Sequence, residues 1–139
     1  MQNHNILALD VGDKRVGMAM SRSDVRVPVA LPTLDRNEQD FWEQITQAAK
    51  QYEINEIVIG LPRGLEGQDT SQTKAAKEFA EELSRHIDLP QRWQDEALTS
   101  VKAESILNSS GKPFAKSDID SLAATFILSD YLESKTGKL

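Results

Sequence analysis

The sequence predicts an α/β fold with a mixed sheet, and two observations support this prediction. In the first 35 residues, apolar runs are separated by short turns, which is typical of an antiparallel meander. Further along, helical stretches alternate with short apolar runs, and strands that are joined by helical crossovers are parallel. We expect residues 1–139 to form one domain, because this length is close to what one hydrophobic core can serve.

Three strands are expected near the N-terminus. Residues 6–11 and 15–21 are apolar-rich, and the three residues between them, beginning with Gly12, have the length of a hairpin connection. Residues 25–34 carry apolar side chains between two prolines. Proline in a strand is typical of a sheet edge or of a strand end, so this strand should lie at the border of the sheet.

The middle of the chain predicts two helices with a buried strand between them. Apolar residues recur at helical spacing from 41 to 52, and Asp35 with Glu38 resembles a capping pair before this helix. Residues 56–61 contain an uninterrupted apolar set, which suits a parallel strand that is buried on both faces. A loop containing glycines then leads to a second helix, with apolar positions from 76 to 87.

The last third of the chain predicts a short strand at 91–94 and two further helices. Thr99 or Ser100 can cap the third helix, which runs to about residue 108, and the last helix runs from about 117 to 132. In this element order, helices should cover both faces of the sheet.

Composition excludes several functional classes. With 22 acidic and 16 basic side chains the net charge is -6, so any nucleic-acid partner requires a local basic patch. No run approaches the roughly 18 apolar residues of a membrane span, and Asp10 interrupts the N-terminal apolar run before it could serve as a signal peptide. We therefore expect a cytoplasmic protein without a membrane partner. Because the chain has no cysteine and two histidines, carboxylates must carry most of any chemistry.

Acidic residues stand at the ends of two expected strands. Asp10 comes near the end of the first strand and is followed by Gly12, where a metal or a phosphate can approach closely, although a turn-initiating aspartate is an equally good interpretation. Asp95 and Glu96 come at the carboxyl end of a presumed parallel strand, where open α/β sheets place their ligands. Acidic residues before a helix are, however, also common because of the helix dipole alone.

Helical geometry distinguishes two aspartates of the last helix. At about 100 degrees per residue, Asp120 falls within the apolar arc, whereas Asp118 projects toward a polar side where solvent can satisfy it. A buried ionised carboxylate is costly unless it is paired or bound to a cation, so Asp120 requires a partner. Carboxylates without cysteine or histidine suit Mg²⁺ or Mn²⁺, which bind phosphates. The residues thus predict a metal-dependent nuclease.

Four segments in a fixed order form a more specific pattern than any one of them alone. They are LDVGDKRVG at 9–17, IGLP at 59–62 with Gly67, DEALTS at 95–100, and IDSLAA at 119–124 continuing to 127–128. As a set, spanning nearly the whole chain, they resemble the YqgF family, short bacterial proteins described as Holliday junction resolvases or pre-16S rRNA nucleases with an RNase H-like fold.

The resemblance implies that Asp10, Glu96 and Asp120 are the catalytic, metal-binding carboxylates, on a five-stranded sheet whose first three strands are antiparallel. It also implies Mg²⁺- or Mn²⁺-dependent hydrolysis by a two-metal mechanism, either in 5′-end processing of precursor 16S rRNA during ribosome biogenesis or in Holliday junction resolution. Two positions depart from the family pattern. Ala97 stands where an arginine usually follows the Asp-Glu pair, and the Ser-Asp after the second strand is stretched and ends at Asp24.

Candidate phosphate contacts lie in the first turn, in the glycine loop and around the third helix. They are Lys14, Arg15, Arg63, Lys102, Lys112 and Lys116. Between residues 99 and 117, three of them stand against Glu104 alone, although a scattered lysine is more often a solubility residue. Residues 37–56, by contrast, carry five acidic side chains and only Lys50, so nucleic acid should avoid that face.

Two other functions are compatible with these residues. Actin-like nucleotide-binding domains also place an Asp-x-Gly on the first hairpin, but they close a nucleotide between two such domains, and this chain has the length of one. A non-catalytic nucleic-acid-binding factor would keep the same fold, and Ala97 favours it. The sequence does not distinguish precursor rRNA from branched DNA as the partner, or a monomer from a homodimer.

Overall fold

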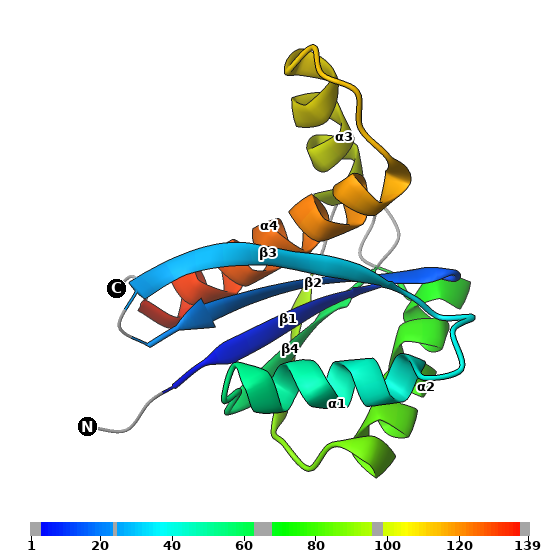
Figure 1. The fold of residues 1–139 in the computed structure, drawn as a ribbon, viewed down its shortest axis with the longest axis vertical. Helices are drawn as coiled ribbons and strands as arrows, with labels where there is room; N and C mark the ends of the chain where they lie inside the picture. The colour runs from blue at the N-terminus through cyan, green and yellow to red at the C-terminus, as the bar shows by residue number, and fades with distance from the viewer. Residues whose placement is uncertain (1–3, 24, 63–67, 96–98, 137–139) are drawn as a thin grey trace.

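The computed structural model describes residues 4–23, 25–62, 68–95 and 99–136, which form five strands and four helices (Figure 1). The strands are β1 (Ile6–Val11), β2 (Arg15–Arg22), β3 (Val25–Asp35), β4 (Glu56–Leu61) and β5 (Gln91–Asp95), and the helices are α1 (Phe41–Gln51), α2 (Ser71–His86), α3 (Thr99–Ser109) and α4 (Lys116–Thr136). Their order along the chain is the order that the sequence predicts.

The strands form one mixed sheet in the order β3-β2-β1-β4-β5. β1 pairs antiparallel with β2, and β2 with β3, whereas β4 runs parallel to both β1 and β5. The predicted meander followed by parallel strands is therefore confirmed. Because β1, β4 and β5 run in the same direction, their carboxyl ends meet at one edge of the sheet.

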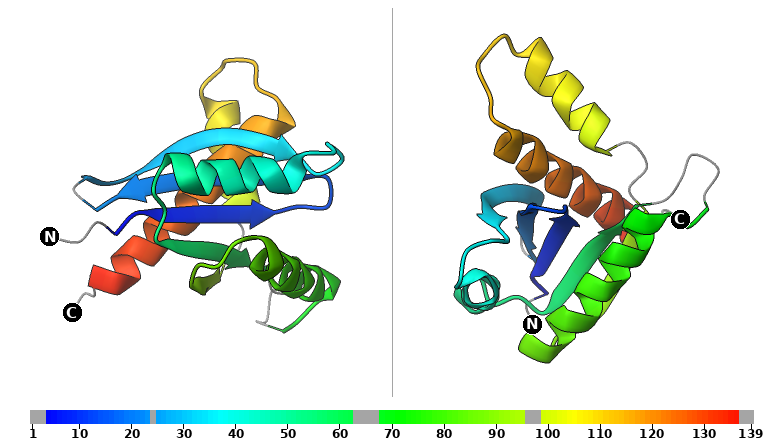
Figure 2. Two further views of the ribbon diagram at one scale, coloured as in Figure 1. Left: turned by 60° about the horizontal axis from the view of Figure 1, so that its bottom comes forward. Right: turned by 90° about the vertical axis from the view of Figure 1, so that its right-hand side faces the viewer.

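Each face of the sheet has its own apolar core, because side chains alternate along a strand. Leu7 and Leu9 of β1 are fully buried in a cluster with residues of α1 and α2, whereas Ile6 and Ala8 pack in a second cluster with residues of α4. Figures 1 and 2 show α4 across one face and α1 and α2 on the other. Helices thus cover both faces, as predicted.

Helix α1 begins later than the predicted capping pair implies. Its N-cap is Asp40, and Asp35 is instead the last residue of β3. The Asp35 Oδ1 accepts a hydrogen bond from the Asn37 backbone N–H at 2.9 Å, so the carboxylate stabilises the turn after the strand. The prediction was wrong because aspartate forms the same local bond to backbone in turns and at helix caps.

Helices α3 and α4 form a hairpin of which only α4 packs on the sheet. The buried residues described in α4 lie between Ala123 and Leu132, in the middle and second half of the helix. α3 projects away from the sheet (Figures 1 and 2), and among its described side chains Ala103 is buried while Ile106 is 47% exposed. No helix within the described ranges combines the length and the hydropathy that a membrane span requires.

Candidate functional site

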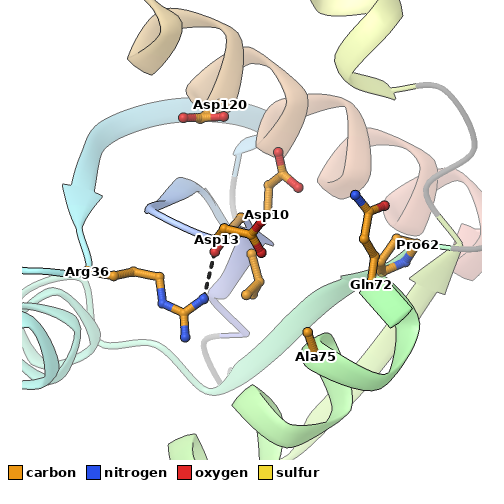
Figure 3. Close-up of a pocket in the computed structure, with 9 residues that line it drawn as sticks. Asp10, Asp13, Arg36, Pro62, Gln72, Ala75 and Asp120 are labelled. Carbon is orange, nitrogen blue, oxygen red and sulfur yellow. Dashed lines mark hydrogen bonds between the residues drawn. The ribbon is translucent and has the colours of Figure 1, made fainter. Parts of the chain in front are cut away.

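Asp10 lies at the carboxyl end of β1, on the sheet face that α4 covers. The alternation that places Ile6 and Ala8 against α4 continues to Asp10, the next residue of the same parity. Asp10 is only 8% exposed, and it lines a pocket of about 180 Å³ (Figure 3). The carboxylate that the sequence singled out therefore faces a small hollow at the edge where the parallel strands end.

The pocket is built by segments that lie far apart in the sequence. Its walls come from the β1–β2 turn, the end of β3, the end of β4, the first turns of α2, and α4. The lining residues are Asp10, Val11, Gly12, Asp13, Arg36, Pro62, Gln72, Ala75 and Asp120. Three of these are carboxylates, and oxygen ligands of this kind suit hard divalent cations.

The wall formed by α2 is anchored to the end of β4. Thr70 caps the helix, and its hydroxyl accepts a hydrogen bond from the Thr73 backbone N–H. The Thr73 hydroxyl, fully buried, accepts from the Thr70 N–H at 2.9 Å and donates a short hydrogen bond to the Pro62 carbonyl. These bonds hold the first turn of α2, with the pocket residue Gln72, against the strand end.

Asp120 reaches the pocket from α4, and its partner is Arg15. The Asp120 Oδ2 accepts a hydrogen bond from Arg15 Nε at 2.7 Å, and the Asp120 side chain is 20% exposed. Arg15 is the first residue of β2 and was expected to contact phosphate; its Nε bonds a carboxylate here, and the phosphate contact stays a prediction. Asp118, in contrast, is exposed and accepts from the Ala115 N–H at 2.9 Å. The predicted difference between the two aspartates is confirmed.

Gly17 permits α4 to lie directly on β2. A Cβ at this position would lie 2.1 Å from the Asp120 carbonyl oxygen and 2.5 Å from its carbonyl carbon, which no real side chain tolerates. Gly17 is also the register partner of Asp10 in the β1–β2 pair. The missing side chain therefore lets the backbone of Asp120 approach the strand pair that carries Asp10. The sequence contains this signal, because a glycine inside a strand often marks a close backbone approach.

Arg36 is a pocket residue that the sequence analysis missed. Its backbone N–H donates to the Lys14 carbonyl at 2.9 Å, and its Nη1 donates to the Gly12 carbonyl at 2.6 Å. The guanidinium carbon lies 5.2 Å from the centroid of the Phe79 ring. No local motif in the sequence marks Arg36. It reaches the pocket only because β3 folds back along β2.

The remaining predicted site residues are not gathered at the pocket by the described part of the structure. Lys14 is exposed in the β1–β2 turn, and Lys112 and Lys116 are exposed in and after the loop between α3 and α4. Glu96 and Arg63 lie outside the described residues, as does the side chain of Lys102. Within the described ranges, no group of three or more His, Cys, Asp or Glu side chains could hold a metal ion.

A second buried carboxylate holds the other end of α4. Glu56, at the start of β4, is 3% exposed and accepts hydrogen bonds from the Tyr131 hydroxyl at 2.5 Å and from His4 Nε2 at 2.6 Å. Arg92 Nε lies 3.4 Å from the same carboxylate. Burial, followed by the hydrogen bond to Glu56, raises the pKa of Tyr131 from its ordinary value of 10.0 to about 12. This cluster lies at the amino end of β4, so it fixes α4 rather than belonging to the pocket.

Comparison with known proteins gives both a family and a fold. A family model described as RuvX, Holliday junction resolvase, matches residues 4–134. A protein of Chloroflexus aurantiacus named "Putative pre-16S rRNA nuclease" is 37% identical over 138 residues, which cover 97% of this chain and 90% of that protein. One with the same name from Sulfurihydrogenibium sp. is 41% identical over 130 residues, with 92% and 89% covered.

Solved structures support the fold independently of sequence. Thermus thermophilus RuvC in complex with a Holliday junction substrate matches with a TM-score of 0.60 at 11% identity, over 96% of this chain and 97% of that one. Another T. thermophilus RuvC structure matches with a TM-score of 0.56 at 9% identity, over 96% of each chain. The predicted RNase H-like fold is thereby confirmed.

Proposed function

This chain belongs to the RuvX family of Holliday junction resolvases, and from that membership we propose that it is a metal-dependent endonuclease that hydrolyses phosphodiester bonds in structured nucleic acid. The observation that carries the proposal is the pocket at the carboxyl edge of the sheet. There Asp10 from β1 and Asp120 from α4, the two carboxylates that the sequence singled out and the structure describes, line the same small cavity.

The carboxylates at this pocket are the type of donor that a hard divalent cation prefers, and a third ligand is required from beyond the described residues. Asp10 and Asp120 would hold Mg²⁺ or Mn²⁺ through carboxylate oxygens, and we propose Glu96 as the third carboxylate. Glu96 follows directly on Asp95, the last residue of β5, and the carboxyl end of β5 meets the same edge of the sheet as that of β1. When bound, one or two such ions would activate water and stabilise the leaving oxygen of a phosphodiester.

The chain's own residues orient this site. Arg15 fixes the Oδ2 atom of Asp120, so the direction of that carboxylate is set while its second oxygen is not occupied by Arg15. Gly17 sets the position of the helix backbone that carries Asp120. Such preorganisation matters because catalytic groups must be held in place before the reaction begins.

Two substrates follow from the names of related proteins. Precursor 16S rRNA is the first candidate, because the curated relatives with near full-length matches carry that name. A four-way DNA junction is the second, because the family model is described as a Holliday junction resolvase. Both are nucleic acids of the cytoplasm, which we propose as the location of this protein.

Parallel cleavage assays test the proposed activity. Precursor 16S rRNA and a four-way DNA junction are incubated with the protein in Mg²⁺, in Mn²⁺ and in chelator. We expect products from at least one substrate with metal and none with chelator. Asp10→Asn should abolish turnover and keep the wild-type circular dichroism spectrum, because it removes one metal-binding charge without emptying the core.

Two results would contradict the proposal. Cleavage that persists in chelator would exclude the metal, and full turnover of Asp10→Asn would exclude the carboxylate site. Binding of either substrate without any cleavage would instead identify the protein as a non-catalytic nucleic-acid-binding factor.

A further inference from the structure

Arg36 places a positive charge in the wall of a pocket that also contains three carboxylates. Asp10, Asp13 and Asp120 line this pocket together with Arg36. Figure 3 shows Arg36 on one side of it and Gln72 with Pro62 on the other, with Asp10 between them. A site for a phosphodiester needs this combination, since the carboxylates attract cations while the phosphate itself requires a cationic partner.

The guanidinium of Arg36 is available to an incoming ligand. In the described part of the chain, no carboxylate oxygen lies within 4.0 Å of its nitrogens, and Nη1 donates only to the Gly12 carbonyl. Arg15 differs, because its Nε is bonded to Asp120 at 2.7 Å. Since a guanidinium carries five N–H donors in a planar fork, Arg36 keeps donors beyond the one that Gly12 takes.

Arg36 is also held in position. The carbonyl of Gly12, at 2.6 Å, fixes one end of the guanidinium beside the turn that follows β1, and the Phe79 ring centroid lies 5.2 Å from the guanidinium carbon, within the range of a cation–π interaction. The ring itself is buried in the core between α1 and α2. A cation fixed in this way loses little freedom when it binds an anion, which is the condition for an effective binding group.

We propose that Arg36 binds the scissile phosphate at this pocket, through hydrogen bonds to a non-bridging oxygen, and is thus a substrate-binding residue of the active site. The proposal rests on the proposed nuclease function and adds a residue to it. A phosphate seated there would lie between the cation of Arg36 and the carboxylate side of the pocket. Because Arg36 would contact the charge that develops on the phosphate during hydrolysis, its loss should affect turnover as well as binding.

The test compares Arg36→Gln and Arg36→Lys with a matched control, Arg26→Gln. Arg26 is exposed near the start of β3 and lines a different pocket with His4 and Leu132, and its substitution changes the net charge by the same amount. Binding of a labelled four-way junction and of precursor 16S rRNA is measured in chelator over a range of salt concentrations. Cleavage kinetics are measured separately in Mg²⁺.

We expect Arg36→Gln to reduce the slope of log affinity against log salt by about one, because one phosphate contact is lost. Its kcat/KM should fall by about a hundredfold, with kcat contributing to the fall. Arg36→Lys should recover the salt slope and part of kcat, since it keeps the charge without the planar fork. Arg26→Gln should match the wild type in kcat/KM.

Wild-type salt slopes and wild-type kcat/KM in Arg36→Gln would overturn the assignment. A loss of activity that Arg36→Lys does not relieve, together with an unchanged salt slope, would also overturn it, because that is the behaviour of a residue that only stabilises the turn. If the wild type cleaves neither substrate, the proposed function fails, and the salt slope measured in chelator still decides whether Arg36 binds phosphate.

Discussion

The position of Asp120 on α4 depends on two residues of β2. Arg15 bonds its carboxylate, and Gly17 gives its backbone room to lie against the sheet. An aspartate in the apolar arc of a helix is costly without a partner, and Arg15 removes that cost by reaching the α4 face from the start of β2. The position of Asp120 at the pocket is therefore stabilised before any cation or substrate arrives.

The roles of Asp120 and Asp118 can be tested with the same substitution at each position. Asp120→Asn should abolish cleavage and reduce stabilisation by Mn²⁺ in thermal melts, because a metal-binding charge is lost. Without metal, it should cost up to about 1 kcal/mol of unfolding free energy, since a half-buried ion pair with Arg15 is broken. Asp118→Asn should behave as the wild type in all three measurements. Retained activity in Asp120→Asn would refute the assignment.

Tyr131 gives the fold a defined response to alkaline pH. Its pKa is raised to about 12 in the folded protein, so folding favours the protonated phenol. The stability that this provides is complete below about pH 10 and is lost as the pH rises toward 12. In Tyr131→Phe, which also lacks the hydrogen bond to Glu56, stability should be lower by about 1–3 kcal/mol at pH 8, and its decline from pH 10 to 12 should be shallower.

Urea unfolding at pH 8, 10 and 11.5 measures this effect, with Tyr52→Phe as the control. Tyr52 is half-buried and makes no contact with Glu56 that the structure describes. The same alkaline profile in Tyr131→Phe and the wild type would show that Tyr131 is not the group responsible.

Helix α4 links the two ends of the sheet, because it reaches from the pocket, through Asp120, to Glu56, through Tyr131. Small residues let it lie close to the strands, because Gly17 of β2 meets the backbone of Asp120, and Ala19 of β2 shares an apolar cluster with Ala124 of α4. Its second half is held by Tyr131 on Glu56, and its first half presents Asp120 to the pocket. A shift of this one helix would therefore change the distance between the two carboxylates of the site.

Substitutions at two glycines, which the fold requires for different reasons, test whether the position of α4 sets the geometry of the site. At Gly17 there is no room for a Cβ, so Gly17→Ala should push α4 outward, cost roughly 1–3 kcal/mol or more, and lower kcat by about a hundredfold. At Gly111 space is open but φ is +72°, so Gly111→Ala should cost about 1 kcal/mol without changing kcat. Urea unfolding and cleavage kinetics of both variants measure the difference. Equal effects of the two substitutions on kcat would contradict the role of Gly17.

The distribution of charge over the whole molecule governs how a nucleic-acid substrate approaches it. The net charge of -6 repels a polyanion, and helix α1, with Glu43 in its first turn, lies on the sheet face opposite α4. We therefore expect nucleic acid to approach at the pocket edge, where Lys14 is exposed in the β1–β2 turn.

The salt dependence of nucleic-acid binding tests which surface the substrate contacts. Lys14→Ala should weaken binding uniformly across sequences and reduce the salt slope by about one. Lys50→Ala, at an exposed position in the last turn of α1, should leave the slope unchanged. An unchanged slope in Lys14→Ala would move the contact surface elsewhere, and Lys112 and Lys116 after α3 would then be the positions to substitute.

Features that depend on local periodicity could be predicted from the residues alone. Alternation and helical spacing predicted the order of the elements, and the helical phase separated Asp120 from Asp118, because both depend on residues only a few positions apart. The position of Asp10 at a strand end followed from the same kind of pattern. The start of α1 did not, because Asp35 forms the same local bond in a turn as at a helix cap.

Contacts between residues that are distant in the sequence became evident only in the folded chain. Arg15 bonds Asp120, a partner that the sequence did not predict, because Arg15 points to the sheet face that α4 covers. Arg36 reaches the pocket because β3 returns along β2 and ends beside the first turn. A sequence records order along the chain and not distance in space, so neither the pairing of Arg15 nor the place of Arg36 was visible until the strands were assembled into a sheet.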